Sequence, residues 1–277
     1  MMMLDQYAVF GHPISHSKSP RIHSLFAEQT GQQIHYVAQD VPAGAFKAAA
    51  DTFFAADGKG LNCTVPLKEL AWQYAGQLSV SARKSKAVNT LARLADGSIL
   101  GDNTDGIGLV RDLTINHNIT LANSRILILG AGGATRGILH PLLAQNPAHI
   151  SIVNRTRHKA DTIVHEFADL GSLNSCDYAD LTSLQFDLII NATSASLSDE
   201  LPPLPDALLA ANGYCYDLAY ANKPTAFVRW GKTQHARKSL DGLGMLVEQA
   251  AEAFALWRGI RPETGPVIDL LNREREA

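Results

Sequence analysis

The sequence contains little cysteine, and its apolar runs are short. Its three cysteines, Cys63, Cys176 and Cys215, lie far apart and form no Cys-X-X-Cys pair. This spacing argues against a disulfide framework or a zinc site and favours buried thiols in a reducing compartment. No uninterrupted apolar stretch approaches the ~18 residues of a membrane span. No basic segment precedes an apolar stretch near the first residues, so we expect no signal peptide and a cytoplasmic protein.

An excess of charge of one sign is also missing. Lys and Arg number 24 against 27 Asp and Glu, a formal net charge of −3, which argues against a strongly basic nucleic-acid-binding face. The chain has 277 residues, of which 46% are hydrophobic and 18% charged. That composition is typical of a globular protein, and the length suggests about two domains.

Short β-rich runs alternate with helical stretches in the first third of the chain. We predict strands over 7–10, 34–39 and 60–64, helices over 19–30, 43–56 and from Pro66 onward, and a hairpin with arms 88–94 and 98–101. The first helix is expected to begin with Ser19 as its N-cap, because serine caps well and Pro20 fits the first helical position. Helices between strands predict parallel pairing in a layered α/β domain.

A second α/β unit is predicted after a helix over 106–117. Its strands are expected at 125–129, 150–153, 187–190 and 214–217, with helical stretches between them and a last helix over 242–257. This alternation predicts an open, doubly wound sheet. We therefore expect one domain over 1–105, completed by 241–277, and another over 106–240.

A glycine-rich turn follows the first strand of the second unit. It reads Gly130-Ala131-Gly132-Gly133-Ala134, with Thr135 where a third glycine is usual. The first glycine permits a tight turn, the second lets a ligand approach the backbone, and the N–H groups of the following helix face an anion. The turn favours a dinucleotide pyrophosphate; a tight turn without a ligand is the alternative.

Basic residues follow the next strand, where an NAD-binding fold usually has an acid. The chain reads Asn154-Arg155-Thr156-Arg157-His158-Lys159 at the expected start of a helix, where the helix dipole disfavours cations. The 2′-phosphate of NADP would remove this conflict, so we expect NADP rather than NAD. The alternative is a solvated basic face.

Four polar clusters follow predicted elements of the first domain, where open α/β sheets place ligands. They lie at 16–20, 62–68, 87–90 and 101–106. Two serines at a helix N-terminus suit a small carboxylate, and strand alternation puts Asn62 and Thr64 on one side, with Cys63 and Val65 on the other. Each cluster also has a simpler explanation: a helix cap for Ser19 or Asp105, a surface lysine for Lys68, and a buried amide for Asn89.

Eight motifs taken together resemble the shikimate dehydrogenase family. They are the segment 11–20, Asn62-X-Thr64-Val65-Pro66-X-Lys68, Ala87-Val88-Asn89-Thr90, Asn103-Thr104-Asp105-Gly106, the glycine-rich turn, Asn154-Arg155-Thr156, Asn191-Ala192-Thr193-Ser194 and Asp241-Gly242-Leu243-Gly244-Met245. They run in order from near residue 7 to about residue 257. The resemblance implies reversible NADP-linked reduction of 3-dehydroshikimate to shikimate, on the route to chorismate and the aromatic amino acids. It also implies an N-terminal α/β substrate domain, a Rossmann-like NADP domain, and a C-terminal helical segment that returns to the first.

The resemblance assigns roles to residues of this sequence. Ser17, Ser19, Thr64 and Tyr220 would hold the carboxylate of shikimate, and Asn62, Asn89 and Gln249 would contact its hydroxyls. Lys68 and Asp105 would flank the hydroxyl that is oxidised. The cofactor residues would be Gly130, Ala131, Gly132, Gly133, Ala134, Asn154, Arg155, Thr156, Lys159, Thr193 and Gly242. Without the resemblance, Tyr220 is a loop aromatic and Gln249 a helix-surface amide. Lys159 stands where the family often has arginine, and it lacks the planar fork of that side chain.

A lysine beside a carboxylate suits this chemistry, because hydride transfer to a carbonyl leaves an alkoxide that needs a proton. No metal is required, and we expect a monomer or homodimer. Three alternatives remain: an NAD-using quinate/shikimate dehydrogenase relative, a folate-linked dehydrogenase, and a non-catalytic ligand-sensing protein on the same scaffold. Arg155 disfavours the NAD-using relative, and the paired serines Ser17 and Ser19 disfavour the folate-linked dehydrogenase. The presence of both Lys68 and Asp105 disfavours the non-catalytic protein.

Overall fold

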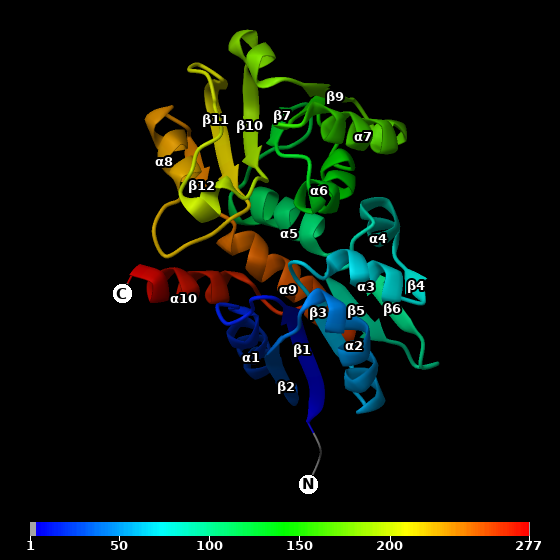
Figure 1. The fold of residues 1–277 in the computed structure, drawn as a ribbon. Helices are drawn as coiled ribbons and strands as arrows, with labels where there is room; N and C mark the ends of the chain where they lie inside the picture. The colour runs from blue at the N-terminus through cyan, green and yellow to red at the C-terminus, as the bar shows by residue number, and fades with distance from the viewer. Residues whose placement is uncertain (1–3, 277) are drawn as a thin grey trace. The chain divides into compact units, whose positions relative to one another are not determined.

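The computed structural model describes residues 4–276 and divides into two compact units (Figure 1). The first comprises the chain up to Gly108 together with Val247–Leu270, and the second Leu109–Leu246 together with the chain from Leu271 onward. The chain leaves the first unit within α5 (Asp105–Arg111) and returns to it within α9 (Leu243–Arg258). Both crossings lie a few residues later than the sequence predicts.

The last helix also differs from the predicted domain boundaries. It is α10 (Gly265–Glu276), which the sequence analysis did not predict, and its final residues group with the second unit rather than completing the first. The Arg275 guanidinium pairs there with the carboxylate of Asp241. None of the helices formed by residues 4–276 is long and apolar enough to cross a membrane.

The first unit contains a mixed six-stranded sheet in the order β2-β1-β3-β5-β6-β4. Its strands are β1 (Asp5–Gly11), β2 (Ile34–Asp40), β3 (Gly60–Cys63), β4 (Gln77–Leu78), β5 (Thr90–Arg93) and β6 (Ile99–Asp102). β1 pairs in parallel with β2 and β3, as the intervening helices predict. β5 and β6 form the predicted antiparallel hairpin, with Gly97 at a φ of 84° in its turn.

The helices of this unit depart from the predictions mainly at their first residues. They are α1 (Ser19–Thr30), α2 (Phe46–Ala55) after a 3₁₀ turn at Ala43–Ala45, α3 (Lys68–Tyr74) and α4 (Val80–Ser85). The prediction that Ser19 caps α1 is wrong, because the N-cap position is Lys18 and no side chain caps it. Instead, Ser17 Oγ accepts the N–H of Ser19 at 3.3 Å. α3 begins two residues after Pro66, and α4 was not predicted.

The second unit contains the predicted parallel sheet, in the order β12-β11-β10-β7-β8-β9. Its strands are β7 (Arg125–Leu129), β8 (His149–Val153), β9 (Leu173–Cys176), β10 (Phe186–Asn191), β11 (Leu209–Asp217) and β12 (Lys238–Leu240). The helices α6 (Gly133–Leu143), α7 (Arg157–Phe167) and α8 (Ala226–Thr233) alternate with them. The strand order reverses at β7, and such a switch point is where doubly wound sheets bind ligands. The predicted helix over 106–117 is α5 followed by a π-helical turn at Asp112–Asn116.

Candidate active site

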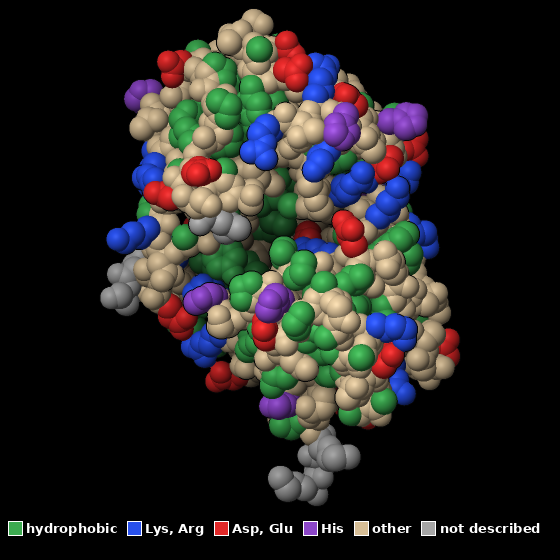
Figure 2. Space-filling view, viewed as in Figure 1, with side chains coloured by type: hydrophobic (Ala, Val, Ile, Leu, Met, Phe, Trp, Pro, Cys, Tyr) green, Lys and Arg blue, Asp and Glu red, His purple; other side chains and the backbone are tan. Residues whose placement is uncertain are grey.

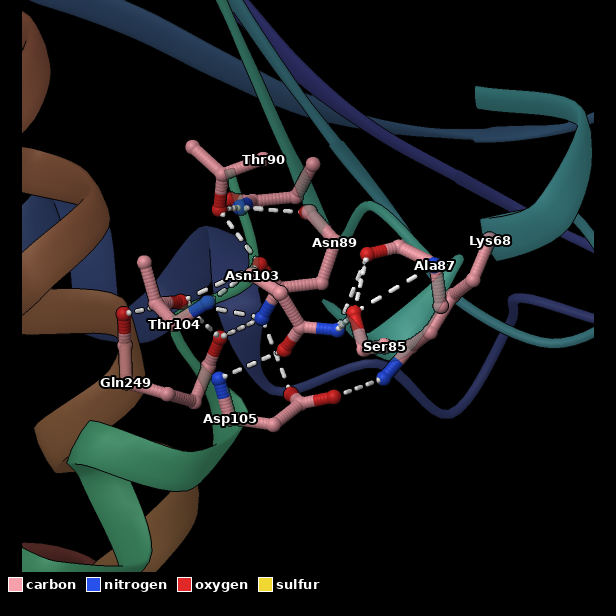
Figure 3. A network of polar contacts seen from close by, with 10 residues as sticks. Lys68, Ser85, Ala87, Asn89, Thr90, Asn103, Thr104, Asp105 and Gln249 are labelled. Atoms are coloured by element: carbon pink, nitrogen blue, oxygen red, sulfur yellow. Dashed lines mark hydrogen bonds and ion pairs between the residues drawn. The ribbon is translucent and has the colours of Figure 1, made fainter. Parts of the chain in front are cut away.

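Two charged side chains, 37 positions apart in the sequence, meet in the first unit. Lys68 is the first residue of α3 and Asp105 the first residue of α5. Lys68 Nζ lies 2.5 Å from Asp105 Oδ2 (Figure 3). The lysine side chain is 27% exposed and the aspartate side chain 11%, so the pair is mostly removed from bulk water. A cation in the first turn of a helix is unfavourable, and Asp105 supplies the opposite charge.

The side-chain amide of Asn89 holds this pair against α9. Its Nδ2 donates to Asp105 Oδ1 at 2.9 Å, to Thr104 Oγ1 at 2.9 Å and to Gln249 Oε1 at 3.2 Å. Its Oδ1 accepts the N–H of Thr104 at 2.9 Å and the hydroxyl of Thr90 at 2.9 Å. Asn89 is 3% exposed, and a buried amide with these partners has a fixed orientation. Its structural role is therefore evident, and its contact with substrate stays a prediction.

Gln249 is not the surface amide of the simpler interpretation. It lies half-buried on α9, and its backbone carbonyl accepts the Thr104 hydroxyl at 3.0 Å. A Cβ atom on Gly108 of α5 would lie 2.7 Å from Gln249 Cβ, so only glycine lets the two helices approach this closely. α9 thus brings Gln249 to a cluster that is 160 positions away at Asn89.

Thr104 also belongs to this cluster, although the sequence predicted no role for it inside its motif. Asn103 also supports the cluster, because its Nδ2 donates to the Ala87 carbonyl at 3.0 Å and its Oδ1 accepts the N–H of Asp105 at 3.1 Å. A threonine between an asparagine and an aspartate carries no sequence signal of its own that would indicate a functional role. Only the neighbouring Asn103 and Asp105 could have drawn attention to it.

The remaining predicted substrate residues of this unit gather around β3. Asn62 is 7% exposed, and its Oδ1 accepts the Tyr36 hydroxyl at 2.7 Å. Ser19, 9% exposed, is hydrogen-bonded to the same phenol oxygen, and Ser17 is half-buried. β3 ends at Cys63, so the predicted alternation stops there and Val65 is 70% exposed rather than in the core.

Thr64 and Tyr220 complete the predicted carboxylate group in different units. Thr64 is half-buried, and its N–H donates to the Phe10 carbonyl at 2.9 Å. Tyr220 belongs to the second unit, in the loop after β11, where burial raises the pKa of its hydroxyl. Both hydroxyls are therefore neutral groups that suit hydrogen bonding to a carboxylate.

The glycine-rich turn after β7 leaves backbone open to a ligand. Gly130 has a φ of 102°, which favours glycine. Cβ atoms on Gly132 or Gly133 would meet nothing within 4 Å, and α6 begins at Gly133 without a side-chain cap. Thr135, at the position of the missing third glycine, is fully buried and its hydroxyl donates to the Gly130 carbonyl at 2.8 Å. Uncapped N–H groups beside open space fit a phosphate group.

The structure distinguishes among the basic residues after β8. Arg157 Nη1 lies 2.5 Å from Asp177 Oδ2, and Asp161 and Asp180 are also close. The charge of Arg157 is therefore compensated by carboxylates, and the conflict with the helix dipole that the sequence predicts does not apply to it. Arg155 precedes the helix, is exposed, and has no ion pair within residues 4–276; the same is true of Lys159 in the first turn.

Asn154 connects the two cofactor segments. Its Oδ1 accepts the N–H of Ala131 at 3.2 Å, and its Nδ2 donates to the Thr156 carbonyl at 2.8 Å. Asn154 therefore ties the glycine-rich turn to the segment that carries Arg155. This arrangement fits a dinucleotide with an additional phosphate group, as the sequence predicts.

The other two predicted cofactor residues, Thr193 and Gly242, follow β10 and β12. Thr193 donates through its N–H and its hydroxyl to Asn191 Oδ1, at 3.2 and 2.7 Å. A Cβ atom on Gly242 would come 2.2 Å from the Leu218 carbonyl oxygen, so glycine is required there by backbone packing. Within residues 4–276, no group of three or more His, Cys, Asp or Glu side chains is placed to hold a metal ion.

Comparison with known proteins identifies the family. The family model for the shikimate dehydrogenase substrate binding domain matches residues 9–91, that for shikimate / quinate 5-dehydrogenase residues 113–198, and that for the shikimate 5′-dehydrogenase C-terminal domain residues 242–271. The shikimate dehydrogenase (NADP(+)) of Methylococcus capsulatus is 61% identical over 99% of both chains. The chain belongs to the shikimate dehydrogenase family. The enzyme of the same name from Cellvibrio japonicus is 54% identical, over 98% of both chains.

Solved structures of shikimate dehydrogenases and their relatives share the fold. An Ael1 enzyme from Pseudomonas putida is 45% identical and has a TM-score of 0.90, covering 96% of this chain and 98% of its own. Shikimate 5-dehydrogenase from Thermus thermophilus, solved with NADP(H) and shikimate, is 32% identical with a TM-score of 0.87, over 99% of this chain and 100% of its own. The predicted family, the two-part α/β fold, the oxidoreductase class and NADP as the cofactor are confirmed.

Proposed function

We propose that the chain catalyses the reversible NADPH-dependent reduction of 3-dehydroshikimate to shikimate, a step toward chorismate and the aromatic amino acids. The observation that carries this proposal is the partly buried contact between Lys68 and Asp105, held in place by Asn89. A protein that only sensed a ligand would not need a proton donor paired in this way. The direct test is consumption of NADPH when the protein is given 3-dehydroshikimate, with shikimate identified as the product.

The acid–base pair performs the proton transfer of this reaction. When bound, NADPH supplies the hydride. The alkoxide left on the substrate is stabilised by the Lys68 ammonium, which delivers the proton to its oxygen. Asp105 holds the ammonium through Oδ2, while Asn89 fixes the other carboxylate oxygen. In the oxidation direction Lys68 removes the same proton, and Asp105 holds the ammonium that forms.

The carboxylate of the substrate is assigned to Ser17, Ser19, Thr64 and Tyr220, and its hydroxyls to Asn62, Asn89 and Gln249. The start of α1 supports the first assignment. Ser17 and Ser19 precede and open this helix without a side-chain cap at Lys18. The uncapped helix N-terminus and the half-buried Ser17 hydroxyl favour a small anion.

Ser17→Ala is expected to raise the KM for shikimate several-fold and leave the KM for NADP⁺ unchanged. It should also lower the free energy of unfolding by up to about 1 kcal/mol, because Ser17 Oγ accepts the N–H of Ser19. Ser24→Ala is a matched control, since Ser24 lies on the same helix and its hydroxyl donates to the Pro20 carbonyl at 2.8 Å. Unchanged shikimate kinetics in Ser17→Ala would remove this residue from the site.

Arg155→Ala is expected to weaken NADP⁺ binding by about 1–3 kcal/mol, the scale of a lost charge-assisted contact, while scarcely altering the use of NAD⁺. The matched control is Arg157→Ala, because Arg157 is already paired with Asp177. Steady-state kinetics with both cofactors measure the effect. Equal losses with NADP⁺ and NAD⁺ would contradict the assignment of Arg155 to the 2′-phosphate.

The proposal extends to partners and location. On the face shown in Figure 2, Lys and Arg side chains are interspersed with Asp and Glu, and the net charge is −3, which supports a small-molecule substrate rather than a nucleic acid. We propose a monomer or homodimer. The three thiols are free and buried, which supports a reducing compartment, the cytoplasm.

A further inference from the structure

Tyr36 is a buried residue that no predicted role includes. It lies on β2 and is 7% exposed. Its hydroxyl donates to Asn62 Oδ1 at 2.7 Å, and the hydroxyl of Ser19 is hydrogen-bonded to its oxygen. Because a phenol has one proton, which here goes to Asn62, the second bond must be donated by Ser19. Tyr36 therefore connects two residues assigned to opposite ends of the substrate.

From Asn62, a further series of hydrogen bonds leads to the Lys68–Asp105 pair, each residue donating to the next. Asn62 Nδ2 donates to Thr90 Oγ1 at 3.0 Å, and the Thr90 hydroxyl donates to Asn89 Oδ1 at 2.9 Å. Asn89 Nδ2 then donates to Asp105 Oδ1 at 2.9 Å. Thr90 is fully buried, so water does not substitute for its hydroxyl. Figure 3 shows the Thr90, Asn89 and Asp105 part of this chain of bonds.

The order of donors leaves each amide with one orientation. Asn62 Nδ2 also donates to the Asn89 carbonyl at 3.1 Å. Both of its protons are thus used inside the protein, and only its oxygen can accept a bond from a substrate hydroxyl. Hydrogen bonds in such a chain polarise and strengthen one another. Removing one hydroxyl therefore affects the bonds on both sides of it.

We propose that Tyr36 and Thr90 are positioning residues, which link the start of α1 to the Lys68–Asp105 pair through one buried chain of hydrogen bonds. Neither touches the reacting atoms. Tyr36 fixes the Asn62 amide and the Ser19 hydroxyl, and Thr90 fixes the Asn89 amide that holds Asp105. The inference rests on the proposed function, because the substrate is assigned there.

The test uses substitutions that remove a hydroxyl and keep the shape of the side chain. Tyr36→Phe is expected to raise the KM for shikimate about tenfold with kcat within about twofold, and Thr90→Val to lower kcat about tenfold. Thr90→Ser keeps the hydroxyl and is expected to restore kcat to within about twofold of the original enzyme. The KM for NADP⁺ should not change in any of them.

Tyr7→Phe is the matched control for the loss of a buried tyrosine hydroxyl. Tyr7 is the register partner of Tyr36 on β1, and its hydroxyl receives a bond from Arg258 rather than from a predicted substrate residue. This variant should lower the melting temperature without changing shikimate kinetics. Tyr36→Phe combined with Thr90→Val should reduce kcat/KM by much less than the product of the two single effects.

The outcomes separate this inference from the proposed function. If the original enzyme does not oxidise shikimate, the proposed function fails. If the original enzyme does oxidise shikimate, three results would overturn the proposed chain of hydrogen bonds. These are shikimate kinetics of Tyr36→Phe that match those of Tyr7→Phe, a kcat of Thr90→Ser as low as that of Thr90→Val, and full additivity in the double variant. A change in melting temperature alone, with unchanged KM and kcat, would also overturn it.

Discussion

Lys68→Ala is expected to lower turnover of shikimate by roughly 10²–10⁴-fold, the usual effect of removing a positioned acid–base group. NADP⁺ binding and the fold should be retained, while the free energy of unfolding should fall by about 1–3 kcal/mol, because Asp105, with a side chain 11% exposed, loses its partner. The measurements are kcat at saturating NADP⁺, the dissociation constant of NADP⁺, and thermal unfolding. Lys47→Ala is the control, since Lys47 forms an exposed pair with Asp51, 2.8 Å apart.

Asp105→Ala should be similarly damaging. If the two residues act as a unit, the double variant should lose much less than the sum of the two logarithms. Full additivity would indicate separate roles for the lysine and the carboxylate. Near-normal turnover in Lys68→Ala would mean that the proton moves along another path.

Acidification is expected to destabilise the protein through His23. This ring is fully buried, and burial lowers its pKa from 6.5 to about 3. Below pH 6.5 His23 is protonated in the unfolded chain but stays neutral in the folded protein. The free energy of unfolding therefore falls as pH falls, by about 1.4 kcal/mol per pH unit down to pH 3. The loss from this group should reach about 2 kcal/mol at pH 5 relative to neutral pH, measured by urea unfolding.

His23→Phe should remove this component of the pH dependence. The His23 ring stacks on Tyr36 with centroids 4.2 Å apart, and its contact with Asn62 opposes only part of the effect of burial on its pKa. Phenylalanine keeps an aromatic ring there and removes the group that titrates, so stability at neutral pH should not fall by more than about 1 kcal/mol. His35→Phe, at an exposed position, should keep the acid sensitivity. An unchanged pH slope in His23→Phe would contradict the assignment.

Elements with strong apolar patterns are predicted well from this sequence. β7 occupies the predicted residues, because its run of Ile and Leu is buried within the sheet. β9 and β12 were missed, since their sequences, LNSC and KSL, are short and polar. They become strands by pairing at the two edges of the sheet, and such tertiary context overrides local propensity.

In the candidate site, too, residues in local motifs could be predicted, whereas residues whose contacts depend on the strand order could not. Lys68 and Asp105 belong to recognisable motifs, and the structure brings them together. Tyr36 has the sequence signature of an ordinary core aromatic on a strand, and its contacts with Asn62 and Ser19 depend on how β2, β1 and β3 are ordered. The prediction that Ser19 caps α1 was wrong, because local propensity could not show that the Ser17 hydroxyl accepts the N–H of Ser19 in this turn.

The most direct test of the account is a set of initial rates with shikimate and with quinate, each given NADP⁺ and NAD⁺. We expect efficient oxidation of shikimate with NADP⁺, because the exposed Arg155, which has no ion pair within residues 4–276, stands where an NAD-binding fold usually has an acid. Rates with NAD⁺ should be much lower, and quinate should be a poorer substrate. Preferential use of NAD⁺, or of quinate over shikimate, would contradict it.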